Sequence, residues 1–179
     1  MSPGEPSPRT DAEPMAFTPD EFLRGAVAAW LAFNLLFDLL YAAMAIVTSD
    51  PRWGPLTATL GVLLIYAVPI ALVVSGVVTL LLCGAAWWLG RLLRRHRRPA
   101  VHVIAFAMLG AAIGLLAVGT FELVTARSLD LGNGLALITI ASSAAALPLG
   151  WAWTVRRSRR AEAGTAQASR PDLAEAAER

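Results

Sequence analysis

The chain has 179 residues, of which 56% are hydrophobic and only 16% are charged, and its formal net charge is +2. Soluble domains contain about 25% charged residues, so this balance disfavours a soluble enzyme, a disordered chain and a free nucleic-acid-binding protein. The single cysteine excludes an intrachain disulfide framework and a zinc site built from several cysteines.

Residues 1–17 are predicted to form a disordered cytosolic tail, because prolines recur there among small and acidic residues. A helix start follows this tail directly. Thr18 has the position of an N-cap, Pro19 that of the first helical residue, and Glu21 that of the reciprocal partner in a capping box. We therefore expect the first helix to begin here.

Apolar blocks follow at about 25–47, 57–89, 101–125 and 131–155. About 20 apolar residues suffice to cross a bilayer as a helix, and no block alternates polar and apolar residues as barrel strands do. We expect an all-α integral membrane bundle of four transmembrane helices over 18–158, with a flexible cytosolic tail at 159–179. Pro69 predicts a kink in the long second block, and Pro148 a bend in the last one.

The arginine residues predict the orientation of the bundle, because cytosolic connections of membrane proteins collect basic residues. Each of the connections 48–56 and 126–130 contains a single arginine, Arg52 and Arg127. We therefore expect a multi-pass plasma-membrane protein with both termini cytoplasmic. The arginines that follow the second and fourth blocks form two clusters, which suit anionic lipid head groups. We expect no nucleic-acid partner. The clustered arginines follow the second and fourth blocks: Arg91, Arg94, Arg95, Arg97, Arg98, Arg156, Arg157, Arg159 and Arg160.

Small residues indicate where the helices pack, because close backbone contact drives helix association in lipid. Ala67, Ala71 and Ser75 begin a row at i+4 spacing that continues through Thr79 and Cys83. The third block contains a GxxxG motif, and the fourth contains a run of alanine and serine. We expect these faces to form the interior of one bundle, with a homodimer interface as the alternative for the GxxxG. The motif and the run contribute Gly110, Gly114 and Ser142.

Polar residues inside the apolar blocks are candidates for function, because a charged carboxylate facing lipid costs at least a few kcal/mol. Asp38 and Glu122 are the acidic residues within the spans, and Asn34 precedes Asp38 by one helical turn. By their depth, Tyr66 and Thr139 should lie near Asp38, which predicts an intramembrane polar cluster in the outer half of the bundle. The alternatives are a neutral Asp38 that only packs, and a Glu122 that reaches toward Arg127 or Arg52.

The distribution of chemistry-bearing residues argues against catalysis. His96 and His102 are expected at the cytosolic face, and the acidic residues in the outer half, roughly 20 Å away along the bilayer normal. A histidine–carboxylate relay needs contact near 3 Å. No nucleotide, metalloprotease or serine-hydrolase motif occurs. We therefore expect no enzyme, no metal and no cofactor.

Two functions remain after these exclusions. The first is a small accessory or structural membrane subunit that acts by helix packing and interaction with another membrane protein or with itself. The second is a small transporter or proton-linked channel that uses Asp38, supported by Asn34 and Glu122. They differ in whether Asp38 carries the activity.

Overall fold

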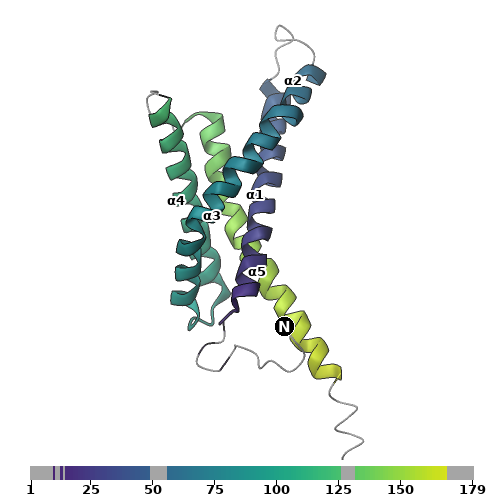
Figure 1. The fold of residues 1–179 in the computed structure, drawn as a ribbon, viewed down its shortest axis with the longest axis vertical. Coiled ribbons are helices and arrows are strands. Elements are labelled where there is room, and N and C mark those ends of the chain that lie inside the picture. The colour runs from purple at the N-terminus through teal and green to yellow at the C-terminus, as the bar shows by residue number, and fades with distance from the viewer. Residues whose placement is uncertain (1–9, 11–12, 14, 49–55, 126–131, 169–179) are drawn as a thin grey trace, which may run out of the picture.

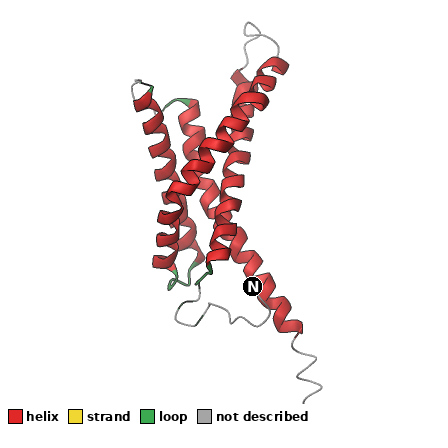
Figure 2. Ribbon diagram, in the orientation of Figure 1, coloured by secondary structure: helices red, strands yellow, loops and turns green. Residues whose placement is uncertain are grey.

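The computed structural model describes residues 10, 13, 15–48, 56–125 and 132–168, which contain helices and short connections but no strand (Figure 2). Four helical segments are long and apolar enough to cross a membrane: α1, α3, α4 and Gly134–Arg160 of α5. The predicted all-α bundle of four membrane-crossing helices is therefore confirmed. In chain order, the elements are α1 (Pro19–Thr48), α2 (Leu56–Val62), the π-helical turn η2 (Leu63–Ala67), α3 (Val68–Leu93), α4 (Pro99–Val124) and α5 (Gly134–Ala168).

The capping box predicted at the start of α1 is present. The Glu21 backbone amide donates a hydrogen bond to Thr18 Oγ1 at 3.2 Å, and the Thr18 amide donates to Glu21 Oε2 at 3.1 Å. Both interactions satisfy amides that have no partner within the helix. The remaining carboxylate oxygen of Glu21 accepts a 2.6 Å hydrogen bond from Ser158 of α5. The cap of α1 is thereby also a contact between the first and last helices.

The second apolar block forms α2, η2 and α3 rather than one regular helix. The π-helical turn at Leu63–Ala67 ends just before Pro69. Proline lacks an amide hydrogen and its ring conflicts with the carbonyl one turn earlier, so helices distort at this position. The kink expected at Pro69 takes the form of a wide helical turn immediately before it.

The bounds of α4 and α5 differ from the predicted ones for local reasons. α4 begins at Pro99, a residue type suited to the first helical position. α5 begins at Gly134, and the Asn133 side chain accepts a 3.0 Å hydrogen bond from the Leu135 amide. α5 continues as a helix to Ala168, beyond the predicted bound at 158, through alanine-rich sequence that favours helix formation. The flexibility of the tail at 159–179 stays a prediction. Residues 169–179 lie outside the described residues.

α5 is the central helix of the bundle. It packs extensively against α1 and α4, whereas α3 contacts α1 and touches α4 at only a few points (Figure 1). The C-terminal ends of α3 and α5 and the N-terminal end of α1 lie at the same end of the bundle (Figure 1). The bundle is therefore closed between α1, α5 and α4 and open between α3 and α4.

Candidate functional site

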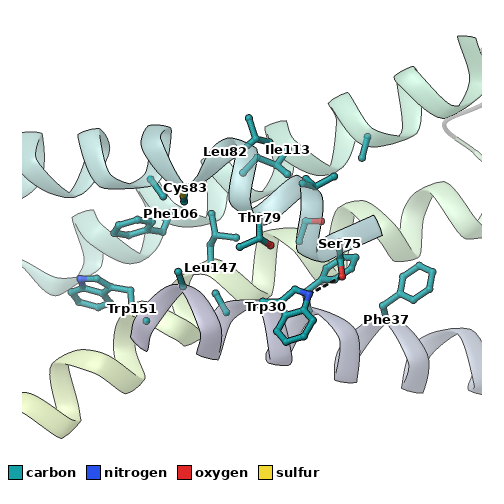
Figure 3. Close-up of a pocket in the computed structure, with 18 of the residues that line it drawn as sticks. Trp30, Phe37, Ser75, Thr79, Leu82, Cys83, Phe106, Ile113, Leu147 and Trp151 are labelled. Carbon is teal, nitrogen blue, oxygen red and sulfur yellow. Dashed lines mark hydrogen bonds between the residues drawn. The ribbon is translucent and has the colours of Figure 1, made fainter. Parts of the chain in front are cut away.

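The open side of the bundle forms a crevice of about 1240 Å³ between α1, α3, α4 and α5, which we call the α3 crevice. On α5 its lining extends from Leu135 to Arg159, about 36 Å at 1.5 Å per residue, and so exceeds the roughly 30 Å of a hydrocarbon core. Most lining side chains are apolar, and Figure 3 shows them converging from all walls. They include Trp30, Phe37, Ser75, Thr79, Leu82, Cys83, Phe106, Ile113, Leu147 and Trp151.

One wall of the crevice depends on the GxxxG motif of α4, whose glycines face α5. A Cβ added to Gly110 would collide with the Ser143 carbonyl oxygen and lie 3.0 Å from Ala144 Cα. A Cβ added to Gly114 would lie 2.8 Å from Ile140 Cα. The motif thus brings two backbones of this chain into direct contact, which is the intramolecular role expected for it.

A second glycine contact joins α1 to α5. A Cβ added to Gly150 would lie 2.6 Å from the Gly25 carbonyl oxygen and 2.9 Å from the Ala29 amide nitrogen. A Cβ added to Gly25 would lie 2.6 Å from Thr154 Oγ1. α5 is therefore held on two sides by close backbone approach, at different levels along its length.

α3 is attached to α1 by hydrogen bonds at one level. Ser75 Oγ accepts from Trp30 Nε1 at 3.0 Å and from Asn34 Nδ2 at 3.1 Å (Figure 3 shows the Trp30 bond). The Ser75 hydroxyl can donate to Asn34 Oδ1, also at 3.1 Å, and Asn34 Nδ2 donates to the Trp30 carbonyl at 2.8 Å. Asn34 is only 4% exposed. This group, which we call the Ser75 contact, satisfies its polar atoms between two helices.

A second attachment, the aromatic cluster, lies near the end of α3. Trp87 makes edge-to-face contacts with Phe17 and Phe22, at centroid distances of 5.1 Å and 5.0 Å. A Cβ on Gly90 would lie 2.6 Å from the Phe17 ring, so only glycine leaves room for it. The segment before α1 therefore packs against α3. The Ser75 contact and the aromatic cluster attach α3 to α1 and to this segment, and the crevice lies between α3 and α4.

Part of the predicted disordered tail takes part in this attachment. Glu13 forms a 3.1 Å ion pair with Arg94, and the Met15 amide donates to the Arg94 carbonyl at 3.2 Å. Of the predicted tail, Glu13 and Met15 thus contact Arg94, which directly follows α3, and Phe17 contacts Trp87 of α3. Disorder over 1–17 as a whole stays a prediction. The rest of 1–14, apart from residue 10, lies outside the described residues.

The predicted small-residue row begins in η2 and continues along the side of α3 that faces the crevice. Ala71, Ser75, Thr79 and Cys83 all line the crevice, and the Ala67 side chain lies outside the described ones. α3 meets α1 at the Ser75 contact and beside Gly76, where an added Cβ would lie 3.7 Å from Trp30 Nε1. Ser142, by contrast, is fully buried on α5. Within this row, Ser75 joins α3 to α1, and Ala71, Thr79 and Cys83 form a wall of the crevice.

The structure disperses the predicted polar cluster. Asn34 bonds to Ser75, whereas Asp38 is partly buried and does not line the crevice. Glu122 of α4, 7% exposed, and Thr139 of α5 both line the crevice, and Thr139 Oγ1 donates within its own helix at 2.8 Å. Tyr66 is 62% exposed on η2 and does not line the crevice. Arg52 and Arg127, suggested as partners of Glu122, lie outside the described residues.

Asp38 remains chemically unusual within α1. Its Oδ1 is buried and has no hydrogen-bond partner in the described part of the chain. A buried polar atom without a hydrogen-bond partner lowers the stability of a fold, and ionisable residues within membrane spans are therefore examined first for function. Asp38 therefore stays a functional candidate on its own, without the neighbours that its depth suggested.

Sequence reasoning missed two aromatic features. Phe33, Phe37 and Tyr41 form a stacked row on α1 facing the crevice, with centroid separations of 5.7 Å and 6.1 Å. Their helical spacing was the available signal. His102, expected at a helix start, is only 2% exposed and stacks on Trp151 of α5 at 5.0 Å. It packs between α4 and α5.

The predicted arginine clusters lie at one end of the bundle, which we call the arginine-rich end. Arg94 binds Glu13 as described above, and the Arg157 guanidinium lies 5.3 Å from the centre of the Trp153 ring. Arg159 lines the crevice at its mouth. Among the described residues, no three His, Cys, Asp or Glu side chains are grouped as metal ligands would be.

In comparisons with known proteins, no family model, no curated protein and no solved structure matches the chain. Fold and crevice together define the class: a multi-pass helical membrane protein whose bundle is open along one side.

Proposed function

We propose that the protein is a small accessory or structural subunit of the plasma membrane that acts by helix packing and interaction. The observation that supports this is the α3 crevice, which leaves four membrane-crossing helices closed on one side and open on the other. Both termini are assigned to the cytoplasm on the distribution of arginine residues. No catalytic step is assigned.

The dimensions of the crevice favour a helical partner. Small-molecule pockets measure about 300–1,000 Å³, and this crevice is both larger and as long as a membrane is thick. A lipid would occupy only one leaflet of that length, whereas a transmembrane helix occupies all of it. Two copies of this chain inserted in the same direction would bring their arginine-rich ends together. The partner proposed is therefore an apolar helix of a different membrane protein.

The only cysteine of the chain provides the test, because Cys83 lines the crevice. We expect that a photoactivatable maleimide attached to Cys83 in native membranes will form one discrete protein adduct. The matched control combines Cys83→Ala with Leu80→Cys, which moves the probe less than one turn to a side chain that is 74% exposed toward lipid. That probe should yield lipid adducts and little or no protein adduct.

Two results would count against the accessory role. Equal adduct patterns from the two positions would mean that the crevice has no dedicated occupant. An adduct whose mass is twice that of the chain would indicate a homodimer instead of a different partner.

A transporter or proton-linked channel is the second candidate, and the buried, unpartnered oxygen of Asp38 is the observation that favours it. Transport sites gather polar groups around a pathway. Here Asn34 is hydrogen-bonded to Ser75, and Glu122 lines the crevice whereas Asp38 does not. The dispersal of these side chains supports ranking this function second.

Substitution of Asp38 separates the two functions. For an accessory subunit, Asp38→Asn should leave folding unchanged or slightly stabilised, because the amide removes a buried ionisable group. Neither protein should then carry pH-gradient-driven proton flux in liposomes, measured with an internal pH dye. Flux that the native protein supports and Asp38→Asn abolishes would establish the transporter instead.

A further inference from the structure

A second apolar groove, distinct from the α3 crevice, runs between α1 and α5. It has a volume of about 760 Å³ and is lined by Val27, Leu31 and Leu149, with alanines between them. These α1 positions lie on a different face of the helix from those that line the crevice. Its lining includes Arg24 and Leu149, the sequence neighbours of Gly25 and Gly150, at which the two helices approach closely.

The charge of this groove is confined to one end. Arg24 of α1 and Arg156 of α5 line it there, beside Trp153, and no acidic residue lines it. Both arginines are exposed, and within the described ranges neither is paired with a carboxylate. Two unpaired guanidinium groups at the end of an apolar groove complement an anion attached to a hydrocarbon chain.

The length of the groove matches one leaflet of a bilayer. On α1 its lining runs from Leu23 to Ala32, about 14 Å along the axis, and half of a hydrocarbon core is about 15 Å. A partner helix would need contact along the full membrane thickness, which this groove does not offer. Trp153 lies at the charged end, where tryptophan is typical of the membrane–water interface.

We propose that this groove binds one anionic phospholipid from the leaflet on the side of the chain termini. The phosphate lies between Arg24 and Arg156, and an acyl chain runs along Val27 and Leu31. With the orientation proposed above, this is the cytoplasmic leaflet, where anionic lipids are abundant. The site is separate from the crevice and does not depend on the identity of any partner protein.

The test is a titration of the purified full-length protein in mild detergent, with bound lipid counted by native mass spectrometry. Phosphatidylglycerol is expected to bind more tightly than phosphatidylcholine with the same acyl chains. Arg24→Gln combined with Arg156→Gln should weaken phosphatidylglycerol binding about thirtyfold, the effect expected of two basic residues at a membrane surface. Arg24→Lys with Arg156→Lys should retain most of the affinity.

The matched control removes the same charge elsewhere on the arginine-rich end. Arg91→Gln with Arg95→Gln changes two exposed arginines that do not line the groove, so the affinity should change less than threefold. Ala32→Phe fills the groove while keeping both arginines, and it should also release the lipid. An unchanged unfolding midpoint in each variant shows that the bundle is intact.

Several outcomes would overturn the proposal. Equal binding of the two lipids, or equal loss in the two arginine pairs, would mean that only the general charge of the surface matters. Displacement of phosphatidylglycerol by equimolar glycerol 3-phosphate would indicate a site for a soluble anion. A covalently captured protein helix at Leu31→Cys, introduced with Cys83→Ala, would assign the groove to a protein partner.

Discussion

Gly110→Ala is expected to force α4 away from α5 and to lower the free energy of unfolding by about 3 kcal/mol, the upper end of the usual effect of overpacking. The added methyl group would collide with the Ser143 carbonyl oxygen and lie 3.0 Å from Ala144 Cα. Both atoms belong to the backbone of a helix, so neither can rotate away as a side chain would. The whole of α5 would have to move, although α1 holds its other side at Gly150.

Unfolding in increasing mole fractions of sodium dodecyl sulfate would measure this loss. Gly119→Ala is the matched control, because it makes the same change in the same helix where, among the described residues, no atom beyond the adjoining helix backbone lies within 4 Å of the new Cβ. It should stabilise the protein by up to about 1 kcal/mol through helix propensity. If the two variants unfold at the same mole fraction of sodium dodecyl sulfate, Gly110 is not in close contact with α5. If Gly110→Ala abolishes a dimer and leaves the monomer folded, the motif is a homodimer interface.

Trp87→Ala is expected to release the end of α3 and to cost about 3 kcal/mol, the low end for truncation of a large aromatic side chain. The indole makes edge-to-face contacts with both Phe17 and Phe22, so its loss removes two aromatic pairs together. The Ser75 contact would remain as the other attachment to α1 that we describe. We also expect Cys83, which lines the crevice, to react several-fold faster with a membrane-permeant maleimide.

The neighbouring tryptophan provides the control for this prediction. Trp88 is 66% exposed and makes no ring contact with another described aromatic residue. Trp88→Ala should change unfolding by less than about 0.5 kcal/mol, as surface substitutions usually do. Equal alkylation rates of Cys83 in both variants would contradict the idea that the aromatic cluster holds α3 in place.

The features predicted well from the sequence are those that depend on local chemistry. Apolar block length was enough to predict four membrane-crossing helices, because the bilayer imposes a minimum length on each. The capping box at Thr18 depends on residues three positions apart. The GxxxG was interpreted as an internal contact because the chain itself offers helices for it to pack on, and the structure places Gly110 and Gly114 against α5.

The direction in which each polar side chain points could not be predicted, because depth in the membrane does not determine direction around a helix. Tyr66 lies within the π-helical turn, and a wider turn changes the direction in which every residue before it points. The sequence places Asn34 and Asp38 on one face of α1, yet the hydrogen-bond partner of the Asn34 side chain is Ser75 on α3. Which helices become neighbours is decided by tertiary packing, and α3 lies against α1 with its other side open.

The glycine contact between α1 and α5 was missed for a related reason. Gly25 and Gly150 form no GxxxG spacing within either helix, and the alanines four residues away, Ala29 and Ala146, are a weaker signal than a second glycine. The two glycines matter only because the antiparallel helices bring them to the same level, with the Gly25 carbonyl oxygen 2.6 Å from a Cβ added to Gly150. The groove that carries the lipid proposal follows from this pairing and has no signature in either segment alone.

The central position of α5 has a consequence for biosynthesis. α1 and α4 make their most extensive contacts with α5, the last of the four spans to leave the ribosome. During translation, α1 can therefore pair only with α3, through Ser75 and the ring of Trp87, while the glycine faces of α1 and α4 stay exposed to lipid. A chain interrupted before Gly134 would lack the helix that joins the others. Quality control of membrane insertion would then encounter a three-span intermediate with an exposed GxxxG, a ready substrate for degradation until the final span arrives.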